Sequence, residues 1–227
     1  MIELVERRII FENYKIIASE IAKIQEAIFD NDIYLDIEDE NKKIEYKNIF
    51  DGMDYKKYPI KYDIKILATG YNEIKIFSNK LYQLLLKLFE KFSITELFIL
   101  LDLKINYYES LFNKYKRLVR VYKKLQKITI KKFYDEAFYL NRLSEEIVEI
   151  IFWLSRCSPQ MNNIIIFDKM ERYYLNICKY GNIHMTGLNG NIISEEVIKK
   201  IGLKIVEGKE NDNFTDNGKI NGRKIKI

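Results

Sequence analysis

The sequence LFNKYKRLVRVYKKLQKITIKK, residues 111–132, holds nine lysine or arginine side chains and not one aspartate or glutamate. The whole chain has 227 residues and a net charge of only +5, so the rest of it carries a net charge of −4. Positive charge is therefore concentrated in one segment, and the shape of that segment decides what surface the protein offers to a partner.

Drawn as a helix with about 100° per residue, this stretch has two distinct sides. Apolar and aromatic side chains fall on one side, namely Leu111, Tyr115, Leu118, Tyr122 and Leu125. A basic stripe falls on the other side and consists of Lys116, Arg120, Lys123 and Lys127, with Arg117 and Lys124 as further basic candidates for partner binding. The pattern predicts an amphipathic helix over residues 106–128 with a basic outer face.

Two more helices are predicted around this one. Ser93 and Glu96 fit a capping box, in which the serine accepts a hydrogen bond from a free backbone N–H and the glutamate reaches back to the cap, so a helix is expected to begin there. Apolar residues at helical spacing predict another helix over residues 134–156. Together these segments predict a helical core over residues 93–157.

The segments on either side favour small β elements. Residues 61–66 and 73–77 alternate polar and apolar side chains around a glycine break, which predicts an antiparallel hairpin. It is expected to lie between a helix over residues 17–31, read from isoleucines three and four positions apart, and a helix over residues 78–92.

Short runs rich in isoleucine and tyrosine follow the helical core. They predict a three-stranded meander over residues 163–186. Ser194 is expected to cap a short helix that Gly202 stops, and a last strand follows at residues 203–206. Residues 209–227 are polar and predict a flexible tail.

The predicted fold class is α+β, with central long amphipathic helices flanked by small antiparallel β elements. We expect a single domain over residues 1–208, made of a hairpin and helices (1–92), the helical core (93–157) and a β-meander (161–208). Two cysteines without metal-ligand spacing favour a reducing cytoplasm. The longest apolar runs are far shorter than the roughly 18 residues of a membrane span, so no membrane association is expected.

Catalytic motifs are scarce. Asp63, Glu73 and Lys75 resemble the D…E-x-K core of the restriction-endonuclease-like nucleases, and on a hairpin they could share one polar face and hold a divalent metal. Alternating glutamate and lysine is equally typical of a solvated strand. His184 is the only histidine and is interpreted as structural or interfacial.

The acidic cluster that begins at Asp30, Asp32 and Asp36 lacks the glycine and glutamate of a calcium loop. It is interpreted as a solvated surface or as the dock of a basic partner. No cofactor, metal ion or catalytic residue is predicted.

Residues 93–118 also resemble a helix-turn-helix unit, in which a short helix near residues 96–101 meets a turn and a recognition helix from Tyr107. The segment departs from that pattern at Phe98, where a small residue is usual, and at Asp102, where a turn glycine is usual. This degenerate unit makes direct nucleic-acid binding an alternative function.

The basic stripe can be interpreted as a surface with no role in binding or as a binding surface. It could be solvated, or it could pack beside Glu145, Glu146 and Glu149 of the following helix. Alternatively it docks on a macromolecular partner with an anionic surface. We favour a cytoplasmic, non-enzymatic binding protein that modulates or inhibits a nucleic-acid-processing enzyme or ribonucleoprotein, as immunity or phage counter-defence proteins do. Direct nucleic-acid binding and a metal-dependent nuclease are the alternatives.

Overall fold

A computed structural model describes residues 2–105, 116–129, 135–157 and 163–207 of the chain. In this part of the chain the strands are β1 (Ile2–Glu6), β2 (Tyr62–Ala68), β3 (Leu97–Leu101), β4 (Glu136–Leu140), β5 (Ile164–Asp168), β6 (Tyr173–Ile177), β7 (Ile183–Leu188) and β8 (Lys204–Ile205). They form one eight-stranded sheet in the order β1-β4-β3-β5-β6-β7-β2-β8, in which every neighbouring pair is antiparallel.

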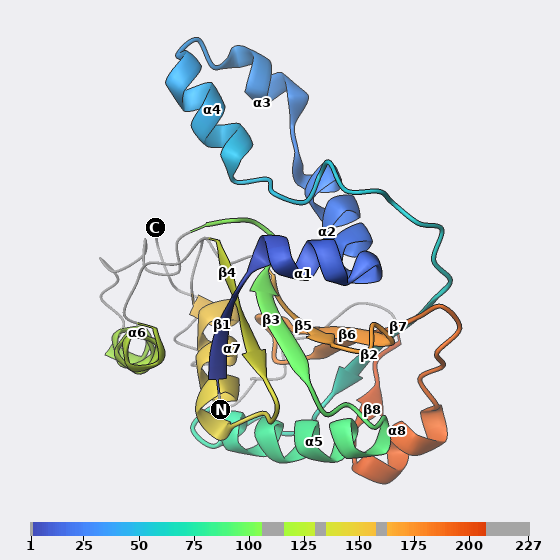
Figure 1. Cartoon of the computed structure of the whole chain (residues 1–227). Helices are drawn as coiled ribbons and strands as arrows, with labels where there is room; N and C mark the ends of the chain where they lie inside the picture. The colour runs from blue at the N-terminus through green and yellow to red at the C-terminus, as the bar shows by residue number, and fades with distance from the viewer. Residues whose placement is uncertain (1, 106–115, 130–134, 158–162, 208–227) are drawn as a thin grey trace.

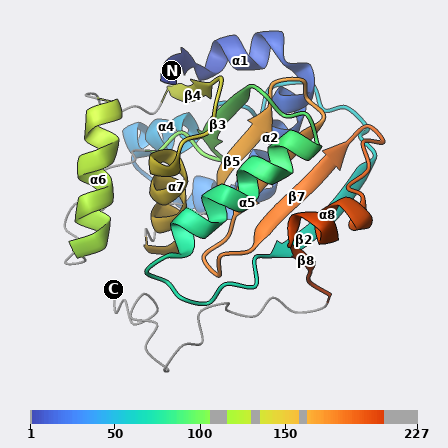
Figure 2. The same ribbon diagram turned by 90° about the horizontal axis from the view of Figure 1, so that it is seen from below.

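Helices cover both faces of this sheet (Figures 1 and 2). They are α1 (Arg7–Asn13), α2 (Lys15–Ile28), α3 (Asn31–Asp36), α4 (Glu40–Asn48), α5 (Phe77–Lys91), α6 (Lys116–Ile128), α7 (Glu145–Cys157) and α8 (Glu195–Ile201). One face packs against α5, α6, α7 and α8, and the other packs against α1 and α2. None of the described helices has both the length and the apolar character that crossing a bilayer requires.

The central strand β3 is buried on both of its faces. All five residues of its sequence LFILL are buried. Leu97, Ile99 and Leu101 face the larger core cluster, whereas Phe98 and Leu100 face the smaller one beneath α1 and α2. A strand that is covered on both sides has no polar face, so its sequence is a continuous apolar run.

The helix predicted to begin at Ser93 is therefore wrong. Ser93 has a positive φ of 54° and does not cap a helix. The Glu96 carboxylate reaches other elements instead, because it accepts hydrogen bonds from Lys169 Nζ at 2.7 Å and from the Tyr139 hydroxyl. The capping-box spacing arose without a helix because burial between β4 and β5 favours the extended form of this segment.

The sheet is also larger and more central than predicted. Residues 136–140 of the predicted helix 134–156 form β4, and the helix itself, α7, begins only at Glu145. At the N-terminus β1 pairs with β4 and forms one edge of the sheet. The three segments predicted from the sequence, residues 1–92, 93–157 and 161–208, all contribute strands to one sheet. The helices therefore pack on the faces of this sheet and are not flanked by small β elements. The coarser α+β prediction is confirmed.

Several local predictions are confirmed. β5, β6 and β7 form the expected meander, and α2 and α5 lie in the segments predicted as helices over residues 17–31 and 78–92. Ser194 Oγ accepts the Val197 N–H at the start of α8, and Gly202 ends that helix with φ 94°. In contrast, residues 73–76 form a turn that leads into α5, so the second strand of the predicted hairpin is absent, and β2 pairs with β7 instead.

A turn between two strands holds the start of α2. Tyr14, at the N-cap, makes no side-chain cap hydrogen bond. Instead Glu171 Oε1, from the β5–β6 turn, accepts the N–H groups of Ile16 and Ile17 at 2.6 and 2.9 Å. A carboxylate at this position satisfies free N–H groups and interacts favourably with the helix dipole. This contact fixes α2 to the sheet.

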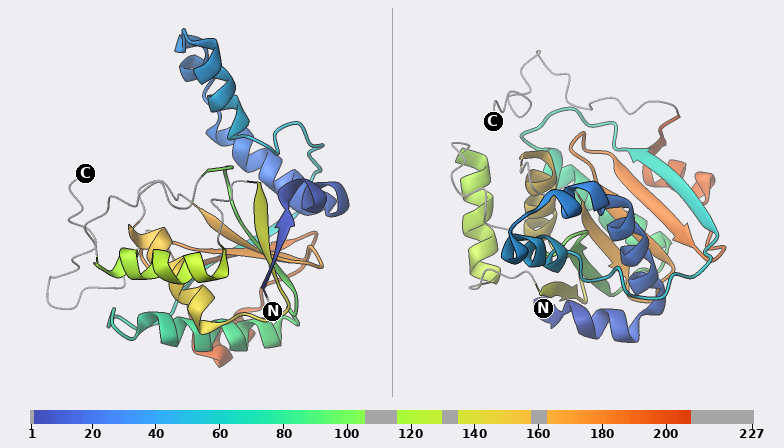
Figure 3. Two further views of the ribbon diagram at one scale, coloured as in Figure 1. Left: turned by 60° about the vertical axis from the view of Figure 1, so that its left-hand side comes forward. Right: turned by 90° about the horizontal axis from the view of Figure 1, so that it is seen from above.

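The helices α3 and α4 leave the body of the molecule as a projecting hairpin (Figures 1 and 3). We call residues 30–48 the arm. Neither of its helices contains a buried residue. The arm therefore contributes no side chain to either core.

Candidate partner-binding surface

One apolar side of α6 attaches this helix to the body. Leu118, Val121, Tyr122 and Leu125 are at most 2% exposed and belong to the larger core cluster. Figure 2 shows α6 running along one side of the molecule next to α7. These residues recur at the three- and four-residue spacing of a helical face, so the sequence pattern fixes which side of α6 points inward.

The other side of α6 is basic and exposed. We call Lys116, Arg120, Lys123 and Lys127 the basic face, and all four side chains are exposed. Four residues spaced over eleven positions extend about 16 Å along a helix. Val119, which borders this face, is 38% exposed. The basic face combines a linear array of positive charge with a small apolar contact.

The pairing with α7 that the sequence left open involves Lys124. Its ammonium group forms an ion pair with Glu149 of α7. Glu145 instead accepts a hydrogen bond from Asn79 Nδ2 at 3.0 Å, and Glu146 is exposed. Lys124 therefore lies at the inner edge of α6, where its charge is neutralised. The Arg117 side chain lies outside the described part of the chain, as do Lys114, Lys131 and Lys132.

Exposed like charges on one helix face carry an energetic cost. Lys116 and Arg120 are four residues apart, and so are Lys123 and Lys127. Each such pair disfavours an isolated helix by about 0.2 to 0.5 kcal/mol. The apolar attachment of α6 offsets this cost, and an anionic partner on the outer side would remove it.

The three residues of the nuclease alternative do not share a strand face. Asp63 lies on β2, where Oδ2 accepts the Ile193 N–H at 2.6 Å and Oδ1 is 3.7 Å from Lys65 Nζ. Glu73 and Lys75 are exposed in the turn before α5. The predicted geometry fails because the hairpin that would have aligned the three residues does not form. Within the described ranges, no three His, Cys, Asp or Glu side chains are grouped closely enough to hold a metal ion.

The structure also revises the interpretation of the other candidate motifs. The first helix of the helix-turn-helix resemblance is strand β3. The predicted recognition helix would begin at Tyr107, in the segment 106–115, which lies outside the described residues. Asp30 caps α3, since Oδ1 accepts the N–H groups of Asp32 and Ile33 at 2.9 and 3.2 Å. His184 lies half-buried on β7, opposite Ile66 and Asn176.

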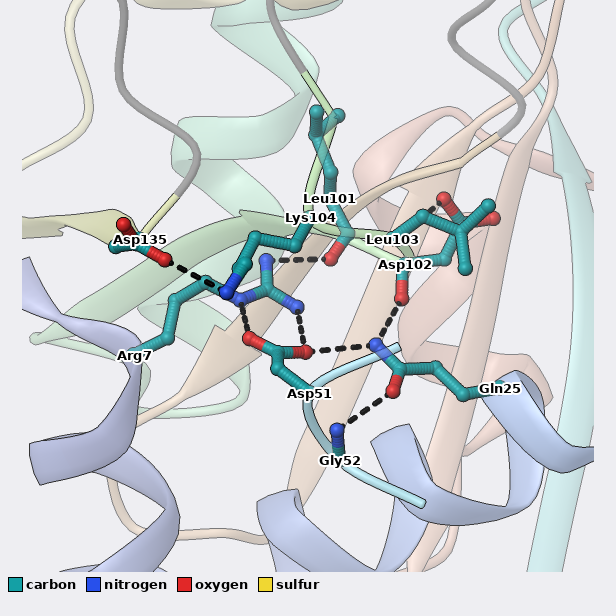
Figure 4. A network of polar contacts seen from close by, with 9 residues as sticks. All are labelled: Arg7, Gln25, Asp51, Gly52, Leu101, Asp102, Leu103, Lys104 and Asp135. Carbon is teal, nitrogen blue, oxygen red and sulfur yellow. Dashed lines mark hydrogen bonds and ion pairs between the residues drawn. The ribbon is translucent and has the colours of Figure 1, made fainter. Parts of the chain in front are cut away.

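A buried polar cluster lies at the end of β3, between β4, α2 and the segment after the arm (Figure 4). Arg7 is 2% exposed and binds both carboxylate oxygens of Asp51, with Nε–Oδ2 at 2.5 Å and Nη2–Oδ1 at 3.0 Å. Its third donor, Nη1, binds the Leu101 carbonyl at 2.8 Å. Gln25 donates to Asp51 Oδ1 and to the Asp102 carbonyl and accepts the Gly52 N–H. We call these residues the Arg7 cluster.

No local sequence pattern predicts the Arg7 cluster. Arg7 and Asp51 are 44 residues apart, and nothing near either residue distinguishes a buried charge from a solvated one. The structure explains in part why residue 52 is a glycine, because a Cβ atom there would lie 2.7 Å from Ile21 Cγ2. The cluster binds the chain just after the arm to the end of β3.

The environment of Asp102, at the end of β3, favours the neutral form of its side-chain carboxyl group. Burial raises the pKa of the Asp102 carboxyl above its ordinary value near 3.8, and hydrogen bonds from Asn163 and the Leu103 N–H offset part of that increase. The folded state therefore binds more protons than the unfolded state at pH values just above 3.8. The stability that the Asp102 carboxyl contributes by binding a proton more tightly in the folded state is complete below pH 3.8. It is lost as the pH rises through the higher pKa that this carboxyl has in the folded state.

We expect Asp102→Asn to remove this pH dependence. The difference in unfolding free energy between the variant and the wild type should shift in favour of the variant as the pH rises from about 4 to 7. Urea unfolding at pH 4, 5, 6 and 7 measures it, with the exposed Asp54→Asn as the matched control. Parallel curves for the wild type and Asp102→Asn would contradict the raised pKa.

Comparisons with protein-family models, with curated proteins and with solved structures found no match to this chain.

Proposed function

We propose that this protein works by binding, and that the basic face of α6 docks on a macromolecular partner with an anionic surface. A protein or ribonucleoprotein, such as a nucleic-acid-processing enzyme, is the preferred partner, which the docked protein modulates or inhibits. The observation that carries the proposal is the arrangement of α6. Its basic face points outward, and Lys124, which lies toward α7, has the Glu149 carboxylate as its partner.

The charge pattern supports docking over simple solvation. A helix that needs only to be soluble can alternate acidic and basic residues and gain from pairs four positions apart. The described part of α6 holds six basic residues and no acidic one. Electrostatic complementarity of this kind raises the rate of association and selects the partner, and it is sensitive to salt.

Charge reversal tests the proposal. The variant Lys116→Glu/Arg120→Glu/Lys123→Glu/Lys127→Glu changes the basic face, and Lys87→Glu/Lys91→Glu/Lys199→Glu/Lys204→Glu makes the same change of charge at four exposed lysines on α5, α8 and β8. We expect a partner recovered with the wild-type protein from cells of its source to be lost with the first variant and retained with the second. Quantitative mass spectrometry of the recovered material measures this difference.

The same variants separate the alternative of direct nucleic-acid binding. Labelled single-stranded and double-stranded DNA and RNA are titrated at about 50 and 200 mM salt. Binding that weakens steeply with salt and is lost in the basic-face variant would favour the alternative. If neither recovered macromolecules nor nucleic acids distinguish the two variants, the basic face is a solvated surface and the proposal is wrong.

A further inference from the structure

The arm is a second exposed surface, and it carries apolar side chains. Ile33 is 52% exposed, Leu35 is 70% exposed and Ile44 is 56% exposed. Three large apolar side chains within a hairpin that projects from the body are unfavourable in water. Burial against another molecule would remove that cost.

The base of the arm is firmly held. Phe29, Tyr34, Tyr46 and Phe50 form a cluster with ring centroids 5.2 to 5.8 Å apart for the pairs that include Phe29. Asp51, which follows Phe50, is fixed by Arg7 and Gln25 of the Arg7 cluster (Figure 4). The arm is thus anchored at the point where it rejoins the body, and its exposed tip is presented in a defined direction.

The arm is acidic. Residues 30–48 contain seven carboxylates and three lysines, which gives a net charge of −4. All seven of these carboxylate residues are exposed. Asp30 and Asp39 cap α3 and α4, and Glu40 pairs with Lys43 Nζ at 3.2 Å. The remaining carboxylates available for contacts with a basic partner are Asp32, Asp36, Glu38 and Glu45. The basic face of α6 carries four positive charges and the exposed Val119, and therefore matches the arm in charge and in the presence of apolar contact.

We propose that the arm of one molecule docks on the basic face of α6 in a second copy of the chain. This inference rests on the proposed function, since it names the second copy as a partner of the same basic face. Within one molecule the two surfaces do not meet, because the arm extends from the α1–α2 side of the sheet whereas α6 lies beside α7 (Figures 1 and 3).

Such a contact joins two different surfaces, so it is heterologous. Each added molecule offers a free arm and a free basic face, and the assembly continues as an open chain or closes as a ring. A hairpin tip on one helix face buries a small area, which predicts weak association. Because exposed charges are screened by salt, the association is strongest at low ionic strength.

A charge-swap experiment tests the contact. The variant Asp32→Lys/Asp36→Lys/Glu38→Lys/Glu45→Lys reverses the arm without touching the cap residues Asp30 and Asp39, and the basic-face variant described above reverses α6. Each variant alone presents two surfaces of like charge and is expected to stay monomeric. An equimolar mixture restores both opposite-charge contacts and is expected to associate.

Sedimentation equilibrium over a wide concentration range, at low and high salt, measures these masses. The wild type is expected to associate with increasing concentration at low salt. Ile33→Ser/Leu35→Ser/Ile44→Ser keeps every charge and is expected to weaken the association constant about tenfold. Circular dichroism confirms that each variant is folded, and the serine variant remains an independent test if charge reversal disturbs the arm.

A wild type that remains monomeric at every concentration overturns the inference, and so does a mixture that fails to associate. These outcomes do not decide the proposed function. If the basic-face variant loses a foreign partner while the wild type never self-associates, the proposed function holds and the second copy is not its partner.

Discussion

Replacing Arg7 with alanine is expected to lower the free energy of unfolding by about 3 to 5 kcal/mol, because the change breaks a buried ion pair and leaves one charge behind. Arg7 binds both oxygens of Asp51 and the Leu101 carbonyl, and its side chain is 3% exposed. After the substitution, Asp51 keeps only the donor of Gln25 among the contacts of the cluster, and Leu101 loses the guanidinium donor. Urea unfolding measures the change.

The neighbouring arginine provides a matched control. Arg8 has a side chain that is 79% exposed and pairs with Glu12 four residues later on α1. Exposed pairs of this kind contribute little to stability because water and salt screen them, so Arg8→Ala is expected to have a much smaller effect. Equal effects of the two substitutions would contradict the structural role assigned to Arg7.

The Arg7 cluster also links stability to the arm. Asp51 and Gly52 are the residues through which the chain returns from the arm to the body, and both are held by Gln25. Arg7→Ala should therefore speed amide exchange in residues 49–52 more than in β5 or β6. The direction of the arm depends on a buried ion pair that lies outside the arm itself.

Local sequence patterns predicted the elements whose conformation is determined by residues close together in the sequence. The isoleucine spacing of α2, the Ser194 cap and the Gly202 stop of α8 each depend on residues within a few positions. The run LFILL has no such local signature, since five apolar residues fit a buried strand or a short buried helix. Its extended form is decided by β4 and β5, which begin about 40 and 70 residues further along the chain.

The same division holds for the candidate sites. The basic face is a periodic pattern within one helix, so the sequence shows it directly, and the structure adds its exposure and the ion pair of Lys124. The Arg7 cluster depends on partners brought together by the sheet, and no pattern around Arg7 or Asp51 predicts them. The projection of the arm was equally hidden, because exposed and buried isoleucines look alike in a sequence.

The presentation of the basic face depends on the packing beneath it, and Leu125→Ala is expected to show this. Leu125 is 1% exposed and lines a small apolar cavity between α6, α7 and the sheet, together with Phe138, Ile150 and Leu154. Removal of a buried leucine side chain costs about 2 to 5 kcal/mol, and the enlarged cavity weakens the attachment of α6 to α7. Urea unfolding measures the loss of stability.

Because α6 is attached through its inner side, the loss is expected to concentrate there. Amide exchange should accelerate in residues 116–128, and binding through the basic face should weaken although every charge remains in place. Gln126→Ala, at the adjacent exposed position, is the matched control and is expected to change neither property appreciably. If Leu125→Ala left partner binding unchanged while loosening α6, the charges would act without a defined helix, and geometric docking would be wrong even though electrostatic attraction remained.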